Sequence, residues 1–374
     1  MRAPLRILIV GGGIAGLALA RALKDRSVAV EVIERAASWT RGGTGLYIPA
    51  NGLRVLGALG LADRVLDRAV RMSHQRILDH TGRPLAQIEL ESFWNRVGPC
   101  VGIARTELHH ILLDGTAGVG VRLGSSVTSL RQDDDEVHVV FADGSTGTYD
   151  LVVGADGIHS SIRQLAFGTL APRHLGQVSW RFLVERSASI DTWTAMLGPQ
   201  RTFLAMPVAP SRLYCFADLA SRAIEDPTAG DPVRLRALFQ DFAEPVRSIL
   251  EGLERVDSMH FSPIEEIALD TWVRGRVVLL GDAAHATSPN MAEGASMALE
   301  DAVVLAGRLS TRDSLPESLA ALSTRRQPRL RWVQHRTHRR DRIRRLPSPL
   351  RNLALRVAGT AIYRRDYQPL LEEP

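Results

Sequence analysis

The sequence has little of what disulfide frameworks, metal centres and membrane spans require. Its 374 residues include two cysteines, Cys100 and Cys215, and neither lies in a CxxC pair or a Cys/His cluster. This excludes a disulfide framework and a zinc site, so we expect no metal and a reducing, cytoplasmic location. The longest early apolar stretch, residues 7–20, is shorter than the roughly 20 residues of a membrane-spanning helix and contains a triple glycine.

Excess charge is also scarce outside one segment. The formal net charge is +5, but residues 325–345 alone hold ten arginines and one aspartate, and the rest of the chain is mildly acidic. A solvated helix face is the simplest interpretation of this arginine-rich segment; contact with anionic lipid, nucleic acid or a partner surface is the alternative. The composition is otherwise ordinary, 45% hydrophobic and 23% charged, and is typical of a globular chain of about two domains.

The N-terminal residues predict a nucleotide-binding turn. An apolar run over 7–10 enters Gly11-Gly12-Gly13-Ile14-Ala15-Gly16, which matches GxGxxG and leads into a helix over 15–23 and a strand over 28–33. In such a βαβ unit the first glycine permits the tight turn, the second lets a pyrophosphate approach the backbone, and the third allows close helix packing. Glu34 ends the second strand, where an acid binds ribose hydroxyls.

The later apolar runs predict that this domain is discontinuous. Residues 120–153 alternate in short runs typical of an antiparallel meander, after which 151–153 return to the first sheet. Strand-like runs at 177–184, 202–208 and 212–217 and a helical stretch over 233–253 indicate an inserted domain. A strand over 277–280, a helix from Gly294 and a C-terminal helix over 350–363 follow, with Tyr363 and Tyr367 expected to cover the inserted domain.

Four ordered blocks give the sequence a family resemblance. They are the GxGxxG unit with Glu34-Arg35, the segment 105–108 (RTEL), the segment 154–157 (GADG) with Ser160 and Arg163, and the segment 281–285 (GDAAH) with Pro289, Gly294 and 300–302 (EDA). Together they resemble the single-component FAD-dependent (class A) monooxygenases related to para-hydroxybenzoate hydroxylase, in particular the compact group of salicylate, urate and zeaxanthin-type oxygenases. The resemblance covers residues 5–330.

The resemblance implies an α/β fold with three parts. A Rossmann-type, GR2-like FAD-binding domain would comprise 1–173 and 271–330, a β-sheet substrate domain would comprise 174–270, and a helical segment would comprise 331–374. The residues implied to contact the cofactor are Gly11, Gly13, Ala15, Gly16, Glu34, Arg35, Arg105, Val127, Asp156, Asp282, Pro289, Gly294 and Ala295. Backbone N–H groups at Gly294 and Ala295 suit the negative charge of a reduced flavin. His285 is expected to be structural.

The implied reaction is an oxygenation. NADH or NADPH, bound transiently, reduces FAD; O₂ then forms a flavin C4a-hydroperoxide that oxygenates, most simply hydroxylates, an aromatic or polycyclic small molecule. Tyr47 and Arg181 are the candidate catalytic residues, Tyr47 as a base only if its pKa is lowered and Arg181 as partner of a substrate carboxylate or enolate. Four residues of the inserted domain are expected to line the substrate pocket: Met206, Pro207, Tyr214 and Phe216.

Two other functions stay open at this point. One is an FAD-dependent reductase or dehydrogenase on the same fold, without oxygen transfer. The other is a non-enzymatic flavin-fold protein that binds nucleic acid or membrane through residues 325–345. We expect no nucleic acid partner and at most weak membrane contact there. No motif distinguishes hydroxylation from epoxidation or Baeyer–Villiger insertion, NADH from NADPH, or one oligomeric state from another.

Overall fold

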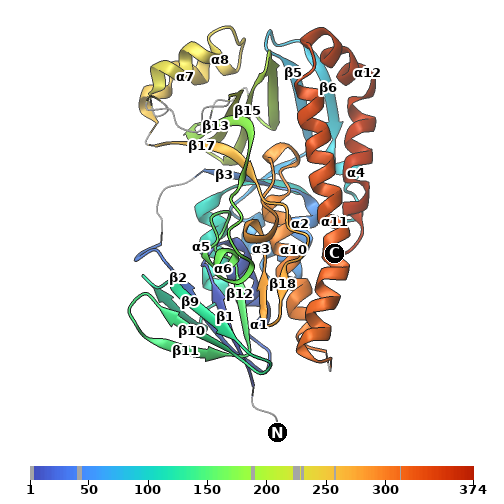
Figure 1. Ribbon diagram of the computed structural model, residues 1–374. Helices are drawn as coiled ribbons and strands as arrows, with labels where there is room; N and C mark the ends of the chain where they lie inside the picture. Colours follow the sequence, from blue (N-terminus) through green and yellow to red (C-terminus); the bar gives the residue numbers. More distant parts are fainter. Residues whose placement is uncertain are drawn as a thin grey trace.

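A computed structural model describes residues 4–39, 44–186, 190–221, 228, 231–256, 258–311 and 313–374. The chain forms two main sheets stacked along one axis, with two long C-terminal helices running beside both (Figure 1). None of the described helices is both long and apolar enough to cross a membrane.

The lower sheet begins with the predicted βαβ unit. Its six strands lie in the order β18 (Val273–Arg274), β19 (Val277–Leu279), β12 (Leu151–Gly154), β1 (Leu5–Val10), β2 (Val28–Glu34) and β8 (Gly120–Leu123). Five of them are parallel neighbours, and β18 alone runs antiparallel, to β19. Both faces of β1 are buried, as a parallel sheet covered by other layers requires.

Helices and smaller sheets surround this sheet. The helices are α1 (Ile14–Leu23), α2 (Ala50–Ala58), α3 (Ala62–Leu66), α5 (Arg105–Gly115), α6 (Ser161–Phe167), α9 (Asp282–His285) and α10 (Gly294–Arg308), with a 3-10 turn η2 (Pro289–Met291). One three-stranded sheet is the predicted meander of β9 (Val127–Gln132), β10 (Val137–Phe141) and β11 (Thr146–Tyr149), which is confirmed. The other joins β3 (Gly45–Ile48), β7 (Cys100–Ala104) and β4 (Val70–Met72).

The upper sheet has seven strands. Their order is β17 (Met259–Glu266), β13 (Arg173–Glu185), β16 (Arg212–Ala220), β15 (Arg201–Ala209), β14 (Trp193–Gly198), β5 (His74–Asp79) and β6 (Pro84–Glu89). One face packs on α7 (Pro232–Phe239), α8 (Val246–Glu251) and η1 (Leu253–Arg255), so the single helix predicted over 233–253 is in fact divided. Strands β5 and β6, with α4 (Leu90–Phe93) after them, come from outside the range 174–270.

The C-terminal segment is two helices joined by a short turn. They are α11 (Leu315–Arg344) and α12 (Ser348–Tyr367), followed by η3 (Gln368–Leu371). The helix α11 contains Pro328 and continues to Arg344, so the predicted domain boundary at residue 330 falls within it. The helix α12 packs on β6, where a Cβ on Gly359 would lie 2.7 Å from the Cβ of Ala86.

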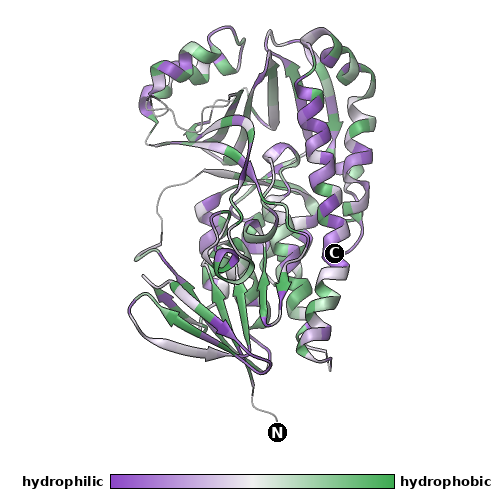
Figure 2. Ribbon diagram, viewed as in Figure 1, coloured by the Kyte–Doolittle hydropathy of each residue, from purple (hydrophilic) through white to green (hydrophobic). Residues whose placement is uncertain are grey.

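The prediction that the arginine-rich segment is a solvated helix face is wrong. Residues 325–344 lie on α11, which is mostly hydrophilic along its upper part, and Arg345 caps its end (Figure 2). Only four of the ten arginines are exposed; Arg326 is fully buried, and Arg329, Arg340 and Arg344 point inward to acidic partners. Much of the positive charge of this segment is therefore paired with acidic groups inside the protein.

Candidate active site

The glycine-rich turn has the geometry that each glycine was predicted to serve. Gly11 has φ +112°, and a Cβ there would lie 2.4 Å from the carbonyl oxygen of Ala155. A Cβ on Gly16 would lie 1.9 Å from the carbonyl oxygen of Gly11, so α1 packs directly on the turn. Around Gly13 nothing lies within 4 Å of such an atom. Gly13 and Ala15 line a cavity, and the open space lies at the N-terminus of α1, where phosphates bind favourably.

Glu34 lies beside this turn. Its carboxylate accepts hydrogen bonds from the backbone N–H of Gly12 at 2.9 Å and of Ala36 at 2.9 Å. The backbone of Ser125 bonds to the carbonyl of Glu34, which brings β9 and the buried Val127 to the same region. Arg35 is exposed. These three predicted contacts therefore lie away from the cavity, next to the far side of the turn.

Asp156 and Arg163 hold the loop between β12 and α6. The Asp156 carboxylate accepts hydrogen bonds from the hydroxyl of Ser160 and the backbone of Ser161 and Ile162. Arg163 is fully buried and donates to the backbone carbonyls of Ala283 and Ile158. Both side chains thus fasten this loop and the segment after β19, while the neighbouring Ala155 and Gly157 line the cavity.

The segment that follows β19 supplies one wall of the cavity. Asp282, Pro289, Gly294 and Ala295 all line it, and Gly294 begins α10. His285 points away: it is buried and its Nε2 lies 2.6 Å from Asp301 Oδ2, as its predicted structural role requires.

The cavity has a volume of about 430 Å³ and lies between the two main sheets. Its roof is the free face of the upper sheet, where every second residue of each strand points inward. On β15 and β16 these are Leu204, Met206, Tyr214 and Phe216. Pro207 lies between two of them and does not line the cavity, so its assignment to the pocket is wrong. Arg181 on β13 also lines it and lies 5.7 Å from the Phe216 ring.

Tyr47 of β3 reaches the same cavity from below. It is buried, and its hydroxyl has no hydrogen-bond partner among the described residues. Burial, together with the neighbouring Cys100 and Tyr363, raises the pKa of Tyr47 well above its ordinary value of 10. Tyr47 therefore keeps its proton at neutral pH, the opposite of what a catalytic base needs.

Two arginines without acidic partners among the described residues lie near Tyr214 in the cavity. Arg105 begins α5 and Arg181 lies on β13; both line the cavity. Burial and the positive charges of Arg181 and Arg105 together lower the pKa of His260 on the adjacent strand β17. This end of the cavity is therefore electropositive.

Two arginines that line the cavity, Arg344 and Arg351, were missed by the sequence reasoning. Arg344 of α11 donates to the buried Asp218 of β16 and to Asn290 of η2, and so joins the helix to both halves of the site. Arg351 of α12 donates to the carbonyls of Gly198 and Leu197. The arginine excess of 325–345 was the only signal available for Arg344, and it gave no hint of partners that lie 54 and 126 residues away.

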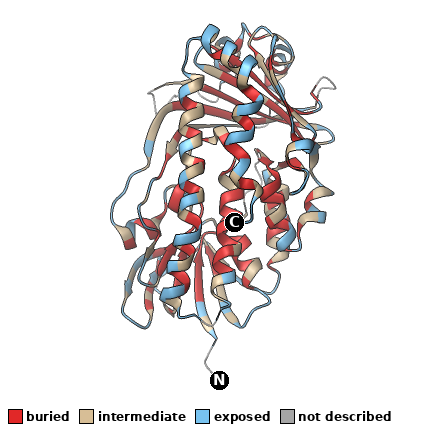
Figure 3. Cartoon of the chain, turned by 90° about the vertical axis from the view of Figure 1, so that its right-hand side faces the viewer, coloured by how far each residue is buried: buried red, intermediate tan, exposed pale blue. Residues whose placement is uncertain are grey.

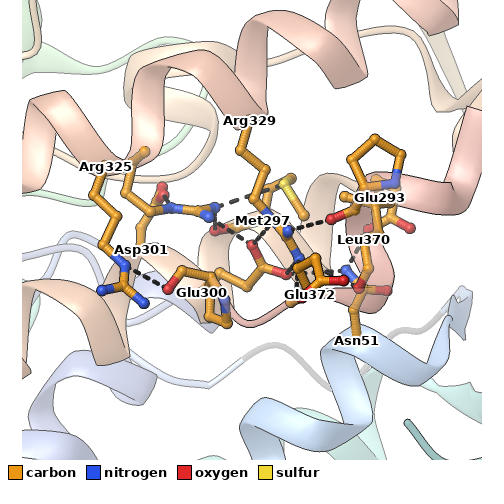
Figure 4. A network of polar contacts seen from close by, with 12 residues as sticks. Asn51, Glu293, Met297, Glu300, Asp301, Arg325, Arg329, Leu370 and Glu372 are labelled. Atoms are coloured by element: carbon orange, nitrogen blue, oxygen red, sulfur yellow. Dashed lines mark hydrogen bonds and ion pairs between the residues drawn. The ribbon is translucent and has the colours of Figure 1, made fainter. Parts of the chain in front are cut away.

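A buried polar network lies behind the wall of α10 (Figure 4). Arg326 binds Glu300 at 2.5 Å and Asp301 at 2.8 Å, and all three side chains are fully buried. Arg329 also binds Glu300, and Asn51 of α2 donates to Glu300 and Glu293. Burial alone would raise the pKa of Glu300, but Arg326 and Arg329 outweigh it and lower that pKa.

Glu293, immediately before α10, is the exception in this network. Its Oε1 has no hydrogen-bond partner among the described residues, and burial, with the nearby charge of Glu300, raises its pKa to about 8. Between pH 4.5 and 8 the unfolded chain therefore loses a proton that the folded protein keeps. The free energy of unfolding consequently falls as the pH rises through this window.

Replacing Glu293 with glutamine should remove this pH dependence. Because glutamine has the shape of the protonated acid, we expect Glu293→Gln to match the parent at pH 5 and to be more stable at pH 8 by about 3 kcal/mol. Thermal unfolding at the two pH values measures this, with Glu91→Gln, an exposed change on α4, as control. Equal unfolding temperatures of Glu293→Gln and parent at pH 8 would contradict the assignment.

Comparison with known proteins identifies the family. The FAD binding domain family matches residues 5–336. The chain is 33% identical over 373 residues to 2-heptyl-3-hydroxy-4(1H)-quinolone synthase of Pseudomonas aeruginosa, covering 97% of both chains. It is 34% identical over 347 residues to 3-amino-4-hydroxybenzoate 2-monooxygenase of Streptomyces cremeus, covering 90% of this chain and 86% of the other. The crystal structure of Klebsiella pneumoniae HpxO with FAD and uric acid superposes with a TM-score of 0.90 at 28% identity, covering 99% and 97%.

These matches decide between the functions that the sequence left open. They extend over nearly the whole chain, so both the FAD-binding sheet and the substrate sheet are included. The reductase and the non-enzymatic alternatives are thereby set aside. The chain belongs to the family of single-component, class A flavin monooxygenases and is an FAD-dependent enzyme that uses NAD(P)H and O₂ to oxygenate an aromatic small molecule.

Proposed function

We propose that the enzyme hydroxylates the ring of a planar, hydrophobic heteroaromatic compound of the quinolone type that carries an apolar side chain. The observation that carries this proposal is the apolar roof of the cavity. Beyond Leu204, Met206 and Phe216, the roof continues through Trp193, Ala195, Ile77 and Ile88 toward the sheet edge. The end-to-end similarity to 2-heptyl-3-hydroxy-4(1H)-quinolone synthase supports the same substrate class.

Three of the five arginines that line the cavity are already bound within the protein, which favours a neutral body for the substrate away from Arg105 and Arg181. Arg344 is paired with Asp218, Arg340 is paired with Asp366, and Arg351 is bound to backbone carbonyls. These guanidinium groups are neutralised or bound within the protein and are poorly suited to anchor a carboxylate. Arg181 has no acidic partner in the described part of the chain, and it would hold the ring oxygen of the substrate.

The residues present fit an FAD molecule. The open space at Gly13 would admit the pyrophosphate, Glu34 and Val127 would flank the adenosine, and Asp282 would bind the ribityl chain or pyrophosphate. The N–H groups of Gly294 and Ala295 at the start of α10 would face the isoalloxazine. When bound, FAD supplies the redox chemistry that passes electrons from NAD(P)H to O₂. The apolar roof would hold the substrate beside the bound cofactor and exclude water.

Tyr47 would act as a hydrogen-bond donor to the substrate. We expect Tyr47→Phe to raise KM by up to about tenfold, since a neutral hydrogen bond contributes about 0.5–1.5 kcal/mol. The pH profile of kcat/KM should keep its shape because the phenol does not titrate near neutral pH. Steady-state kinetics between pH 6 and pH 9 measure both quantities. Loss of an ionisation from the profile of Tyr47→Phe would instead mark Tyr47 as a base.

Turnover with defined substrates tests the proposed function. The FAD-loaded protein is assayed for NADH and NADPH oxidation, O₂ uptake and peroxide with 2-heptyl-4(1H)-quinolone, 3-amino-4-hydroxybenzoate and uric acid. We expect the quinolone to accelerate oxidation with little peroxide and to gain one oxygen atom from isotope-labelled O₂. Coupled turnover of uric acid or the benzoate, with none of the quinolone, would overturn the substrate class while leaving the monooxygenase assignment in place.

A further inference from the structure

The helix α12 has two apolar faces. Its inner face lines the cavity through Leu355, Gly359, Ile362 and Tyr363. Its outer side carries Leu350, Leu353 and Val357, which are 59%, 59% and 79% exposed, and Leu346 just before the helix is 42% exposed. The spacing of three and four residues places them in one stripe along the helix. Large apolar residues at such exposure on successive turns are typical of an interaction surface.

The charge around this stripe is of one sign. The exposed positions between residues 342 and 365 include five arginines, namely Arg342, Arg345, Arg356, Arg364 and Arg365, and no acidic residue. Asp366, the next acid along the helix, is buried against Arg340. Of the five, Arg356 alone has an acidic partner in the described part of the chain, Asp79 at 4.0 Å. The surface thus combines an apolar stripe with a nearly uncompensated positive rim.

A hollow continues the same surface. It lies between α12 and β6 and is lined by Val357, Ala361 and Gln87, with Arg356 and Arg364 also among its lining residues. The two long helices form one side of the molecule, and the exposed positions of α12 lie on that side (Figure 3). No other described element covers the stripe.

We propose that this face, the α12 face, docks on an anionic lipid bilayer. A helix with an apolar stripe and flanking arginines lies in the interface of such a membrane, with its apolar side chains at the acyl boundary and its arginines at the phosphates. A second copy of the chain fits poorly, because a two-fold contact would set the five arginines against their own copies. The docking site therefore lies mainly on α12, and residues 325–345 contribute only Arg342 and Arg345 at their end.

Docking would place the membrane one helix away from the cavity. The same turn of α12 that exposes Val357 outward presents Leu355 and Gly359 to the cavity. An apolar substrate dissolved in the bilayer would then have a short path into the enzyme. This last consequence rests on the proposed function, whereas docking itself does not.

Vesicle sedimentation of the FAD-loaded, full-length protein tests the proposal. We expect binding to phosphatidylcholine vesicles with about one-quarter phosphatidylglycerol to exceed binding to pure phosphatidylcholine by at least about tenfold at low salt. Val357→Asp should lower binding to the anionic vesicles about tenfold. The matched control is Val233→Asp on α7, an equally apolar residue that is 65% exposed and undergoes the same charge change; it should alter binding less than twofold.

Three outcomes would overturn the proposal. They are equal binding to neutral and anionic vesicles, equal effects of the two aspartate variants, and concentration-dependent self-association that Val357→Asp abolishes without any vesicle binding. Retained FAD content and unfolding temperature in both variants confirm that a difference in binding reflects the surface. Because turnover in detergent-free buffer with a soluble quinolone is measured separately, failure of docking is distinguishable from failure of the proposed function.

Discussion

Replacing Arg326 with alanine is expected to destabilise the protein by about 3–5 kcal/mol, because Glu300 and Asp301 would remain buried without their shared cation. Arg329 still reaches Glu300, but Asp301 would keep only His285 and the backbone of Gly281. Since Asp301 also fixes the segment that follows β19, the change should weaken FAD retention as well. Guanidinium unfolding monitored by circular dichroism, with flavin absorbance of the purified protein, measures both effects.

Arg325 provides the matched control for this change. It precedes Arg326 on α11 and is exposed, and its Nε bonds to the carbonyl oxygen of Pro374. Removal of a surface side chain of this kind usually alters stability by no more than about 0.5 kcal/mol. If Arg325→Ala and Arg326→Ala lower the free energy of unfolding by the same amount, the buried network is not the source of the stability.

Replacing Gly13 with valine should abolish FAD binding while leaving the apoprotein folded. The backbone at Gly13 is extended, with φ −82° and ψ −169°, so a side chain is tolerated, and nothing lies within 4 Å of its Cβ. The valine would occupy the space predicted for the pyrophosphate. Loss of two charge-assisted hydrogen bonds there corresponds to a fall in FAD affinity of about 10²-fold to 10⁴-fold. Flavin fluorescence titration and thermal unfolding of the apoprotein measure the two properties separately.

Gly16→Ala gives the contrasting result. Its Cβ would meet the backbone of Gly11, which cannot move without opening the turn, so this variant should lose stability even without FAD. If the apoprotein of Gly13→Val unfolds at as low a temperature as that of Gly16→Ala, Gly13 is needed for packing. In that case the open space there would not be a phosphate site.

The cofactor half of the site was predictable because its residues are local in sequence. The turn at Gly11–Gly16 needs glycines for reasons of backbone geometry, and Gly294 begins a helix whose amides lie at the cavity. Such requirements leave fixed spacings in a sequence. The pocket residues Met206 and Phe216 could likewise be placed by the two-residue period of a strand, but the same period puts Pro207 on the opposite face.

The substrate half was predictable only in part because its contacts are distant in sequence. Strand β5 pairs with β14, so that Gln75 lies opposite Trp193, and no local pattern indicates that pairing. The inward direction of the arginines could not be predicted either. An arginine in a helical segment gives the same sequence pattern whether its guanidinium contacts water or a buried carboxylate. The sequence of 325–345 therefore suggested a solvated surface where the protein has its most buried ion pairs.

The buried ion pairs also make the wall of the FAD-binding half depend on residues that come later in the chain. The glycine turn is translated first, but Glu300 and Asp301 behind the flavin wall are neutralised by Arg326, and Arg329 is held by backbone carbonyls at residues 369–372. A chain that ends at residue 310 would carry the complete GxGxxG motif and both acids, but neither Arg326 nor Arg329. The wall of the site formed by α10 therefore has its counter-charges only once α11 packs against it.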